Sequence, residues 1–355
     1  MIVMLRIVKV SVKLKCEPIM TDRYSRQILF SEIGEAGQKK LKNSFIVIIG
    51  CGALGTIMAT SLVRAGVGKV RIIDRDFIEY HNLQRQVLFN EDDIKSELPK
   101  AIAAERHLRK VNSSIDIEGI VADVNITNIE RFISGADIIL DGLDNFETRF
   151  LINDVALKHN IPWIYGGAIA STGMTMVILP HKTACLYCLI GGLPAKGMVE
   201  TCDTVGVISP APFIIGSLQT AEALKILIGA HNINRDLITV DAWEGTFDRF
   251  EIKPVRNCPA CHGEYKFLEG KFEIKVSSLC GQNAVQILNP GQGQISFKEL
   301  EKRLKPLGKV SFNEFMLHFS VEKYEMVIFP DGRAIVKNIN DVSLARGLYS
   351  KYIGM

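Results

Sequence analysis

A glycine-rich turn early in the chain has the spacing of a phosphate-binding loop. The apolar run Phe45–Ile49 ends in Gly50-x-Gly52-x-x-Gly55, and an amphipathic stretch follows from Ala53. Gly50 and Gly52 allow a sharp turn and a close approach to a ligand, while free backbone N–H groups and the positive end of the helix dipole attract an anion. Because such turns also occur without a nucleotide, the glycines alone are weak evidence.

Polar and charged residues follow the next predicted strand. Asp74 ends the run Val70–Ile73, nineteen positions after Gly55, close to the spacing at which an acid meets a ribose hydroxyl. Further polar residues fall where loops leave the same sheet edge: Asp76, Asn82, Arg85, Lys100, Asp144 and Asn145. Cations beyond the ribose suit a triphosphate, whose transition-state charge they stabilise, and Asp144 is placed to hold Mg²⁺.

The cysteines divide by spacing. Two Cys-x-x-Cys pairs, seventy residues apart, can together offer four thiolates to tetrahedral Zn²⁺: Cys185, Cys188, Cys258 and Cys261. Buried free cysteines are the alternative. Cys202 stands apart in a polar stretch, as a reactive thiol or an inert one. Cys16, Cys51 and Cys280 have no partner motif, and we interpret them as structural.

Composition narrows the class of protein. The 355 residues carry a net charge of +3 with no basic stripe, so we expect no nucleic-acid partner. Residues 1–20 are too short and too charged to span a membrane; they form either an edge strand or an extension preceding a true start at Met20. With eight cysteines and no secretory signal, we expect a reducing cytoplasm and no membrane association.

Strands alternating with helices must position these residues. After a helix at 34–42, strands are expected at 45–49, 69–74, 115–121, 136–140, 163–165 and 237–240, with helices from 53 and at 99–110, 146–159 and 210–228. This order predicts an α/β fold with a Rossmann-like, doubly wound, mainly parallel sheet and an antiparallel extension. A helix at 297–304, a hairpin at 324–337 and a helix at 342–352 predict a small C-terminal α+β domain. We therefore divide the chain into an extension (1–20), a nucleotide-binding domain with zinc knuckles (21–265) and the small domain (266–355).

The ordered set of motifs resembles the MoeB/ThiF adenylyltransferases, relatives of ubiquitin-activating enzymes. The resemblance covers about residues 20–262 and includes Arg23-Tyr24-x-Arg26-Gln27, Gly50-x-Gly52-Ala53-Leu54-Gly55, Asp74-x-Asp76, Asn82-Leu83-x-Arg85-Gln86, Lys100, Asp144-Asn145 and both cysteine pairs. It implies that the C-terminal Gly-Gly carboxylate of a ubiquitin-like sulfur carrier attacks the α-phosphate of ATP, giving an acyl adenylate and pyrophosphate. The sulfur would then serve molybdopterin or thiamine biosynthesis.

Residue roles follow from the resemblance. Asp74 would bind the ribose, Asn82, Arg85 and Lys100 the phosphates, and Asp144 magnesium with Asn145 beside it. Arg26 would reach the ATP of the partner in a homodimer, and Cys202 aligns with a thiol that takes a thioester or persulfide in some relatives. Ala53 stands where many relatives have glycine, and His81 where a small polar residue is usual. Residues 266–355 resemble the short tail of some prokaryotic members, interpreted as a docking or dimer-bracing module.

Two other functions stay open at this point. An NAD-dependent oxidoreductase would share the glycine turn, but it has no need of Arg85 and Lys100 beyond the ribose. A non-catalytic zinc scaffold with a vestigial nucleotide fold would have lost reactive positions, and none of the expected ones is missing.

Overall fold

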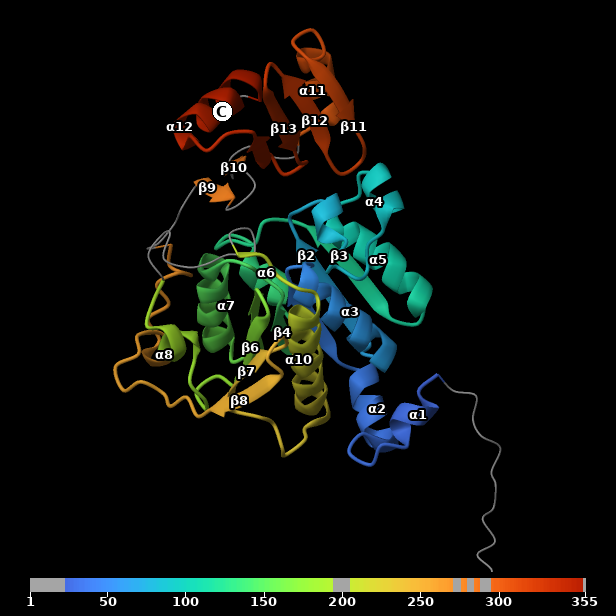
Figure 1. Ribbon diagram of the computed structural model, residues 1–355, viewed down its shortest axis with the longest axis vertical. Helices are drawn as coiled ribbons and strands as arrows, with labels where there is room; N and C mark the ends of the chain where they lie inside the picture. Colours follow the sequence, from blue (N-terminus) through green and yellow to red (C-terminus); the bar gives the residue numbers. More distant parts are fainter. Residues whose placement is uncertain (1–22, 194–204, 271–275, 280–283, 288–294, 354–355) are drawn as a thin grey trace, which may run out of the picture.

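Two sheets organise the chain (Figure 1). The computed structural model describes residues 23–193, 205–270, 276–279, 284–287 and 295–353. The expected strand within residues 1–20, and Cys16, Cys202 and Cys280, lie outside the described residues.

The first sheet has the predicted doubly wound topology. Its eight strands are β1 (Phe45–Ile49), β2 (Lys69–Asp74), β3 (Asp116–Val121), β4 (Ile138–Asp141), β5 (Trp163–Ile169), β6 (Thr172–Ile178), β7 (Leu237–Asp241) and β8 (Thr246–Phe250). They are ordered β3-β2-β1-β4-β5-β6-β7-β8. Strands β1 to β5 pair in parallel and β6 to β8 extend the sheet antiparallel, which confirms the predicted fold class.

Helices cover both faces of this sheet. They are α1 (Ser25–Ile28), α2 (Gly34–Lys42), α3 (Ala53–Ala65), α4 (Glu91–Lys95), α5 (Lys100–Val111), α6 (Ile129–Ile133), α7 (Phe146–His159), α8 (Leu186–Ile190) and α10 (Pro210–Ile228), with the short 3₁₀ helices η1 (Tyr80–Asn82) and η2 (Ala260–His262). The core beside α3, α5 and α10 fills one face, and the core beside α6, α7 and α8 fills the other. The helices predicted at 34–42, 146–159 and 210–228 have the expected bounds.

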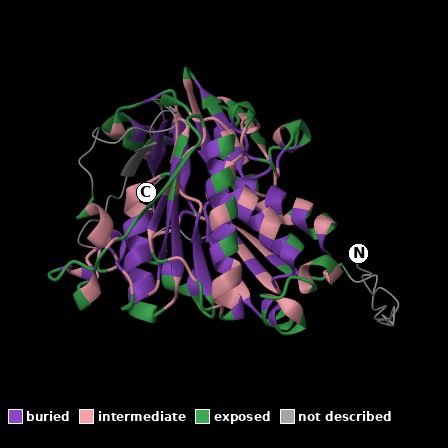
Figure 2. Cartoon of the chain, turned by 60° about the horizontal axis from the view of Figure 1, so that its bottom comes forward, coloured by how far each residue is buried: buried purple, intermediate pink, exposed green. Residues whose placement is uncertain are grey.

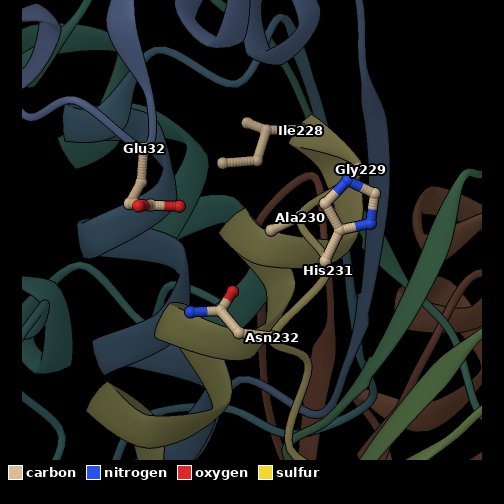
Figure 3. A pocket seen from close by; sticks show the side chains of 6 residues that line it. All are labelled: Glu32, Ile228, Gly229, Ala230, His231 and Asn232. Atoms are coloured by element: carbon tan, nitrogen blue, oxygen red, sulfur yellow. The ribbon is translucent and has the colours of Figure 1, made fainter.

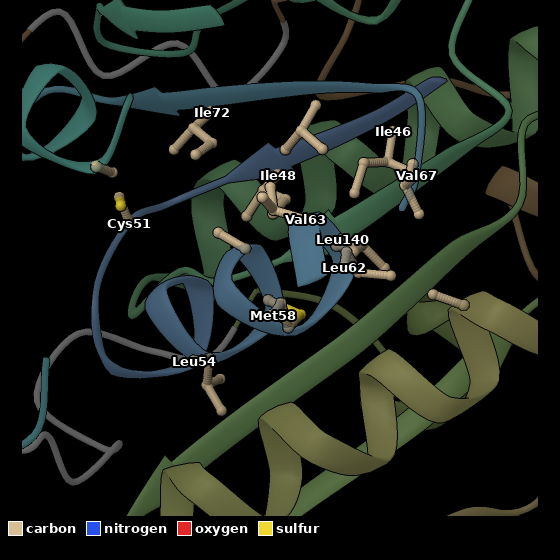
Figure 4. Packing of buried hydrophobic residues seen from close by; sticks show 14 of the residues in the cluster. Ile46, Ile48, Cys51, Leu54, Met58, Leu62, Val63, Val67, Ile72 and Leu140 are labelled. Carbon is tan, nitrogen blue, oxygen red and sulfur yellow. The ribbon is translucent and has the colours of Figure 1, made fainter. Parts of the chain in front are cut away.

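Strand β1 sits at the centre of both cores because its side chains alternate between the two faces. Ile46 and Ile48 pack against Met58 and Leu62 of α3 (Figure 4). Val47 and Ile49 belong to the opposite core. All of these side chains are fully buried. Figure 2 shows the same pattern across the sheet, with buried strands between helices whose outer faces are exposed. A continuous apolar run is therefore the sequence of a strand covered on both sides.

Helix α10 is long and apolar enough to cross a membrane by length and composition, but half of it is buried within the fold. It packs against α3, β5 and β6. Its apolar character is that of a core helix.

The second sheet is antiparallel. Its strands are β9 (Val276–Leu279), β10 (Ala284–Ile287), β11 (Lys309–Phe312), β12 (Leu317–Val321), β13 (Tyr324–Ile328) and β14 (Ala334–Lys337), ordered β11-β12-β13-β14-β10-β9. Helices α11 (Phe297–Leu304) and α12 (Val342–Tyr352) complete its core. The predicted β13–β14 hairpin is present, with Gly332 at φ 84° in its turn. Strands β9 to β12 were not predicted, because their runs are short and separated by irregular segments.

Candidate nucleotide site and cysteine cluster

The glycine turn packs tightly against the loop that follows β4. Gly50 has φ 93°, and a Cβ there would lie 2.5 Å from the carbonyl oxygen of Gly142. At Gly55 a Cβ would lie 2.0 Å from the carbonyl oxygen of Gly50. Only glycine fits at either position, and the protein's own packing is sufficient reason for both.

Gly52 is different. A Cβ there would have its nearest neighbours at 3.8 Å (Gly142 oxygen) and 3.9 Å (Gln86 Nε2), which is ordinary contact. The side chain of Gln86 is buried, and its Oε1 has no hydrogen-bond partner in the described structure. Gly52 also caps the N-terminus of α3 without a side-chain hydrogen bond. Space therefore coincides with the free backbone N–H groups of a helix N-terminus, which are the donors that a phosphate group requires. The unpaired oxygen of Gln86 is an acceptor and would suit a hydroxyl donor of a ligand instead.

Asp74, at the end of β2, holds the glycine turn by a hydrogen bond to its backbone. Its Oδ2 accepts a hydrogen bond from Cys51 N (2.6 Å) and its Oδ1 accepts one from Asp76 N (2.7 Å). Each carboxylate oxygen has a second lone pair, so Asp74 can still accept a hydroxyl hydrogen. Burial raises the pKa of Asp74, against the influence of Lys100.

Lys100 begins α5 and reaches back to the same edge. Its Nζ lies 3.2 Å from Asp76 Oδ2, and its backbone N–H donates to the Asp76 carbonyl oxygen. Burial disfavours the charge of Lys100, but Asp76 and Asp74 outweigh it and raise its pKa above the ordinary value. Lys100 is therefore a charged residue beside the glycine turn. It is only 7% exposed, and its ammonium group is held by Asp76.

The remaining predicted residues of the site differ in how far they are buried and in what their side chains contact. Asn82 is buried, and its Oδ1 accepts from Glu79 N (2.9 Å) to close the η1 turn. Arg85 is half-buried and donates to the carbonyl of His81. Asp144 is exposed, whereas Asn145 caps α7 by accepting from Thr148 N (2.9 Å).

Arg149 is a residue of this site that sequence reasoning missed. Its Nε donates to Asp141 Oδ2 (2.9 Å), and its Nη2 donates to the carbonyls of Leu143 (2.6 Å) and Gly166 (2.7 Å). Both charged side chains are almost fully buried. The pair fixes the loop that carries Asp144. The available signal was an arginine inside an otherwise buried helix, which requires a buried acid nearby.

Arg26 lies far from this edge. The helix that carries it, α1, contacts the C-terminal end of α3, where Gln27 Nε2 donates to Ala65 O (2.8 Å). The glycine turn is at the other end of α3, whose thirteen residues span about 20 Å. The exposed side chain of Arg26 therefore cannot reach the glycine turn of its own chain.

The four paired cysteines come together as predicted from their spacing. Their sulfur atoms all lie within 4.8 Å of one another, although the two pairs come from α8 and from the segment around η2. The Sγ–Sγ distances are 3.8 Å (185–188), 3.5 Å (185–258), 3.7 Å (188–261) and 3.5 Å (185–261). A tetrahedron with Zn–S bonds of about 2.3 Å has edges of about 3.8 Å, so this cluster can hold a zinc-sized ion.

These thiols favour their neutral form where no cation is bound. Without a cation, the contact with Cys261 together with burial raises the pKa of Cys185, and burial raises the pKa of Cys258 to about 12. A dication reverses the preference because it stabilises thiolates. Asn153 of α7 accepts a hydrogen bond from Leu186 N (2.9 Å), which ties the cluster to the face of the sheet covered by α7.

A hollow with no part in this chemistry lies at the C-terminal end of α10 (Figure 3). Glu32 lines one side, and His231 and Asn232 line the other. Gly37 and Lys40 of α2 contact the same end of α10, so the hollow lies beside α2 and away from the glycine turn.

Comparison with known proteins agrees with this geometry. Residues 24–260 match the ThiF family. The chain is 44% identical over 339 residues to the sulfur carrier protein ThiS adenylyltransferase of Bacillus subtilis, covering 94% of this chain and 100% of that protein. It is 35% identical to the protein of the same name from Escherichia coli, covering 68% and 95%. The crystal structure of E. coli MccB with ATP is similar at a TM-score of 0.60 and 27% identity, covering 69% of this chain and 75% of that one. The chain therefore belongs to the ThiF family.

Proposed function

We propose that this protein adenylates the C-terminal Gly-Gly carboxylate of a ThiS-like, ubiquitin-like sulfur carrier with ATP. The observation that carries the proposal is the open space at Gly52 and the N-terminus of α3, next to the buried cation Lys100 and the acid Asp74. The match over the whole length of the B. subtilis adenylyltransferase supports the carrier class. The relatives named above are adenylyltransferases, so neither the oxidoreductase nor the scaffold alternative gains support.

The proposed reaction is a displacement at the α-phosphorus. A carboxylate oxygen of the carrier forms the new P–O bond, the bond from the α-phosphorus to the bridging oxygen breaks, and pyrophosphate leaves with the electron pair. The attacking group is already ionised, so no proton transfer is required. In this proposal Asp74 binds the ribose, and Asn82, Arg85 and Lys100 bind phosphate oxygens and stabilise charge that grows on the leaving group.

Two metal ions complete the proposal. Asp144, with Asn145 beside it, would hold Mg²⁺, which supplies charge compensation to the phosphates. Cys185, Cys188, Cys258 and Cys261 would hold Zn²⁺ in a closed, structural site. Four of the five cysteines that the structure describes are thus assigned to a metal and not to disulfides, which supports a reducing cytoplasm as the proposed compartment.

A homodimer is part of the proposal because Arg26 is too far from its own glycine turn. Leu29 and Phe30, next to it, are 73% and 58% exposed, which suits a protein contact. We propose that Arg26 binds phosphate oxygens in the partner's site, as its forked guanidinium allows.

Subunit mixing tests this arrangement. Arg26→Ala and Asp144→Ala homodimers are each expected to be nearly inactive, and exchanged heterodimers should regain one working site. If verified subunit exchange restores no activity, Arg26 does not act across a dimer.

We also propose a domain division near residue 270. Phe267 packs in the core of the first domain and stacks on Phe150, so the segment just after residue 265 is part of that core.

Carrier-dependent exchange of pyrophosphate into ATP tests the proposed function. Exchange should require Mg²⁺ and an intact terminal Gly-Gly, and Asp144→Ala should lower it by at least about a hundredfold. Asp116→Ala is the matched control. It also removes an exposed acid, but Asp116 begins β3 and so lies at the edge of the sheet opposite to the glycine turn. Wild-type exchange by Asp144→Ala, or exchange with a carrier that lacks Gly-Gly, would refute the assignment.

A further inference from the structure

The second sheet packs directly against the loop that leaves β2. Phe77 and Val121, from the ends of β2 and β3, join the apolar cluster formed by Ala284, Met316, Val327, Phe329 and Ile335. Phe77 also lies edge-on to His318, with ring centroids 6.2 Å apart. The backbone on either side of Phe77 carries Asp76, which contacts Lys100, and Glu79, which contacts Asn82.

Lys337, at the end of β14, makes two contacts with this loop. Its Nζ lies 4.4 Å from the centre of the Phe77 ring and 3.5 Å from Glu79 Oε1. Glu325 Oε1, on β13, lies 3.6 Å from the same nitrogen and holds it in place. The Lys337 side chain is 23% exposed, so these contacts are only partly screened by solvent.

Glu79 transmits this restraint to Asn82. The two residues form a reciprocal capping box around η1, in which each side chain accepts a hydrogen bond from the other's backbone N–H. The Glu79 carboxylate therefore holds the backbone of Asn82, and the Glu79 N–H holds the Asn82 side chain, so restraining Glu79 restrains Asn82.

Asp76 is influenced by the second sheet as well. The guanidinium of Arg333 is buried against the Phe329 ring, 3.5 Å from its centre. Burial alone would raise the pKa of Asp76, but the positive charges of Lys100, Arg75 and Arg333 hold it below the ordinary value. Asp76 is then ionised and holds Lys100.

We propose that Lys337 is a positioning residue of the nucleotide site, which holds the loop 76–82 through Phe77 and Glu79 so that Asn82 and Lys100 are preorganised for phosphate. The inference rests on the proposed function and gives the small domain a role in it. In this proposal the second sheet supports the loop 76–82, and ATP affinity depends on that support.

The test compares ATP binding and turnover in matched variants. Lys337→Ala should weaken ATP binding in calorimetric titration, and raise the KM for ATP in exchange, by about fivefold, the change expected if the whole of an ion pair worth about 1 kcal/mol serves to preorganise the loop for ATP. The kcat should change by less than about twofold, because the reacting groups themselves remain. Lys337→Arg should restore binding, because a guanidinium can reach both Glu79 and Glu325.

Glu314→Gln is the matched control. It removes the Arg106–Glu314 pair (3.3 Å), which joins α5 to the segment before β12 without touching the loop 76–82. If Lys337 only braced the two sheets, both variants would lower the melting temperature alike and neither would change ATP affinity. Wild-type ATP binding by Lys337→Ala would overturn the proposal. Absence of carrier-dependent exchange in the wild type would refute the proposed function instead, while direct ATP titration would still test Lys337.

Discussion

Replacing Arg149 by methionine should strongly destabilise the nucleotide-binding domain. The substitution keeps an apolar side chain in the space but leaves the Asp141 carboxylate, which is 0% exposed, without its cation. The carbonyls of Leu143 and Gly166 lose their donor as well. Removing one partner of a buried ion pair typically costs about 3–5 kcal/mol, so we expect a loss of that size in the free energy of unfolding at pH 8.

The loss should depend on pH in a definite direction. Burial already raises the pKa of Asp141, and only Arg149 and backbone hydrogen bonds oppose it. In the variant the folded-state pKa rises further above the unfolded value, so stability is retained at low pH and lost as pH rises through the folded pKa. The deficit relative to wild type should therefore be smaller at pH 5 than at pH 8.

Urea unfolding at the two pH values measures this difference. Adding Asp141→Asn to Arg149→Met removes the charge but keeps an oxygen for the Leu143 N–H, and should recover about 2 kcal/mol at pH 8. Lys158→Met, which breaks an exposed pair with Glu130, should cost less than about 1 kcal/mol. An equal deficit at both pH values would show that lost packing and carbonyl bonds, rather than the buried charge, dominate.

Three further predictions can be checked independently. Metal analysis of freshly purified protein should find one zinc per chain, and Cys258→Ser should lower both the zinc content and the melting temperature; zinc-free wild-type protein would reject the site. Burial raises the pKa of Asp154 to about 6, so its contribution to stability is lost as pH rises from about 4 through 6. Asp154→Asn should therefore stabilise the protein by about 1–3 kcal/mol at pH 8 and remove that pH dependence in thermal melts. A destabilised variant would show that burial of the Asp154 charge does not lower stability at pH 8. Cys202→Ala should leave pyrophosphate exchange intact and abolish any thioester or persulfide with the carrier, and loss of exchange in a folded variant would refute this division.

Local sequence patterns predicted the first domain well because its central strands are continuous apolar runs and its helices have recognisable residues at their ends. Phe45–Ile49 could hardly be anything but a buried strand, and Phe146–His159 has a capping asparagine before it and Asn160 in the left-handed conformation after it. The bounds of β4 are Ile138–Asp141 and not the predicted 136–140, because the strand begins where Ile138 pairs with Ile46 of β1 and continues to Asp141, which pairs with Ile49.

The residues that sequence reasoning missed depend on distant contacts. Arg149 and Asp141 are eight positions apart, but the ion pair between them is visible only once α7 packs beside β4. Lys337 meets Glu79 across more than 250 positions, and no local pattern in either segment indicates the other. The four short strands β9 to β12 gain their stability from pairing across the sheet, so single-segment patterns could not reveal them.

The glycines of the turn also bear on how this chain can evolve. Gly50 and Gly55 are imposed by steric contact within the protein, so a descendant that had lost nucleotide binding would still be selected to keep both. Gly52 has no such neighbour and would be free to acquire a side chain. Among descendants of this protein, drift at position 52 alone would therefore mark the loss of catalysis, even where the rest of the glycine pattern survived.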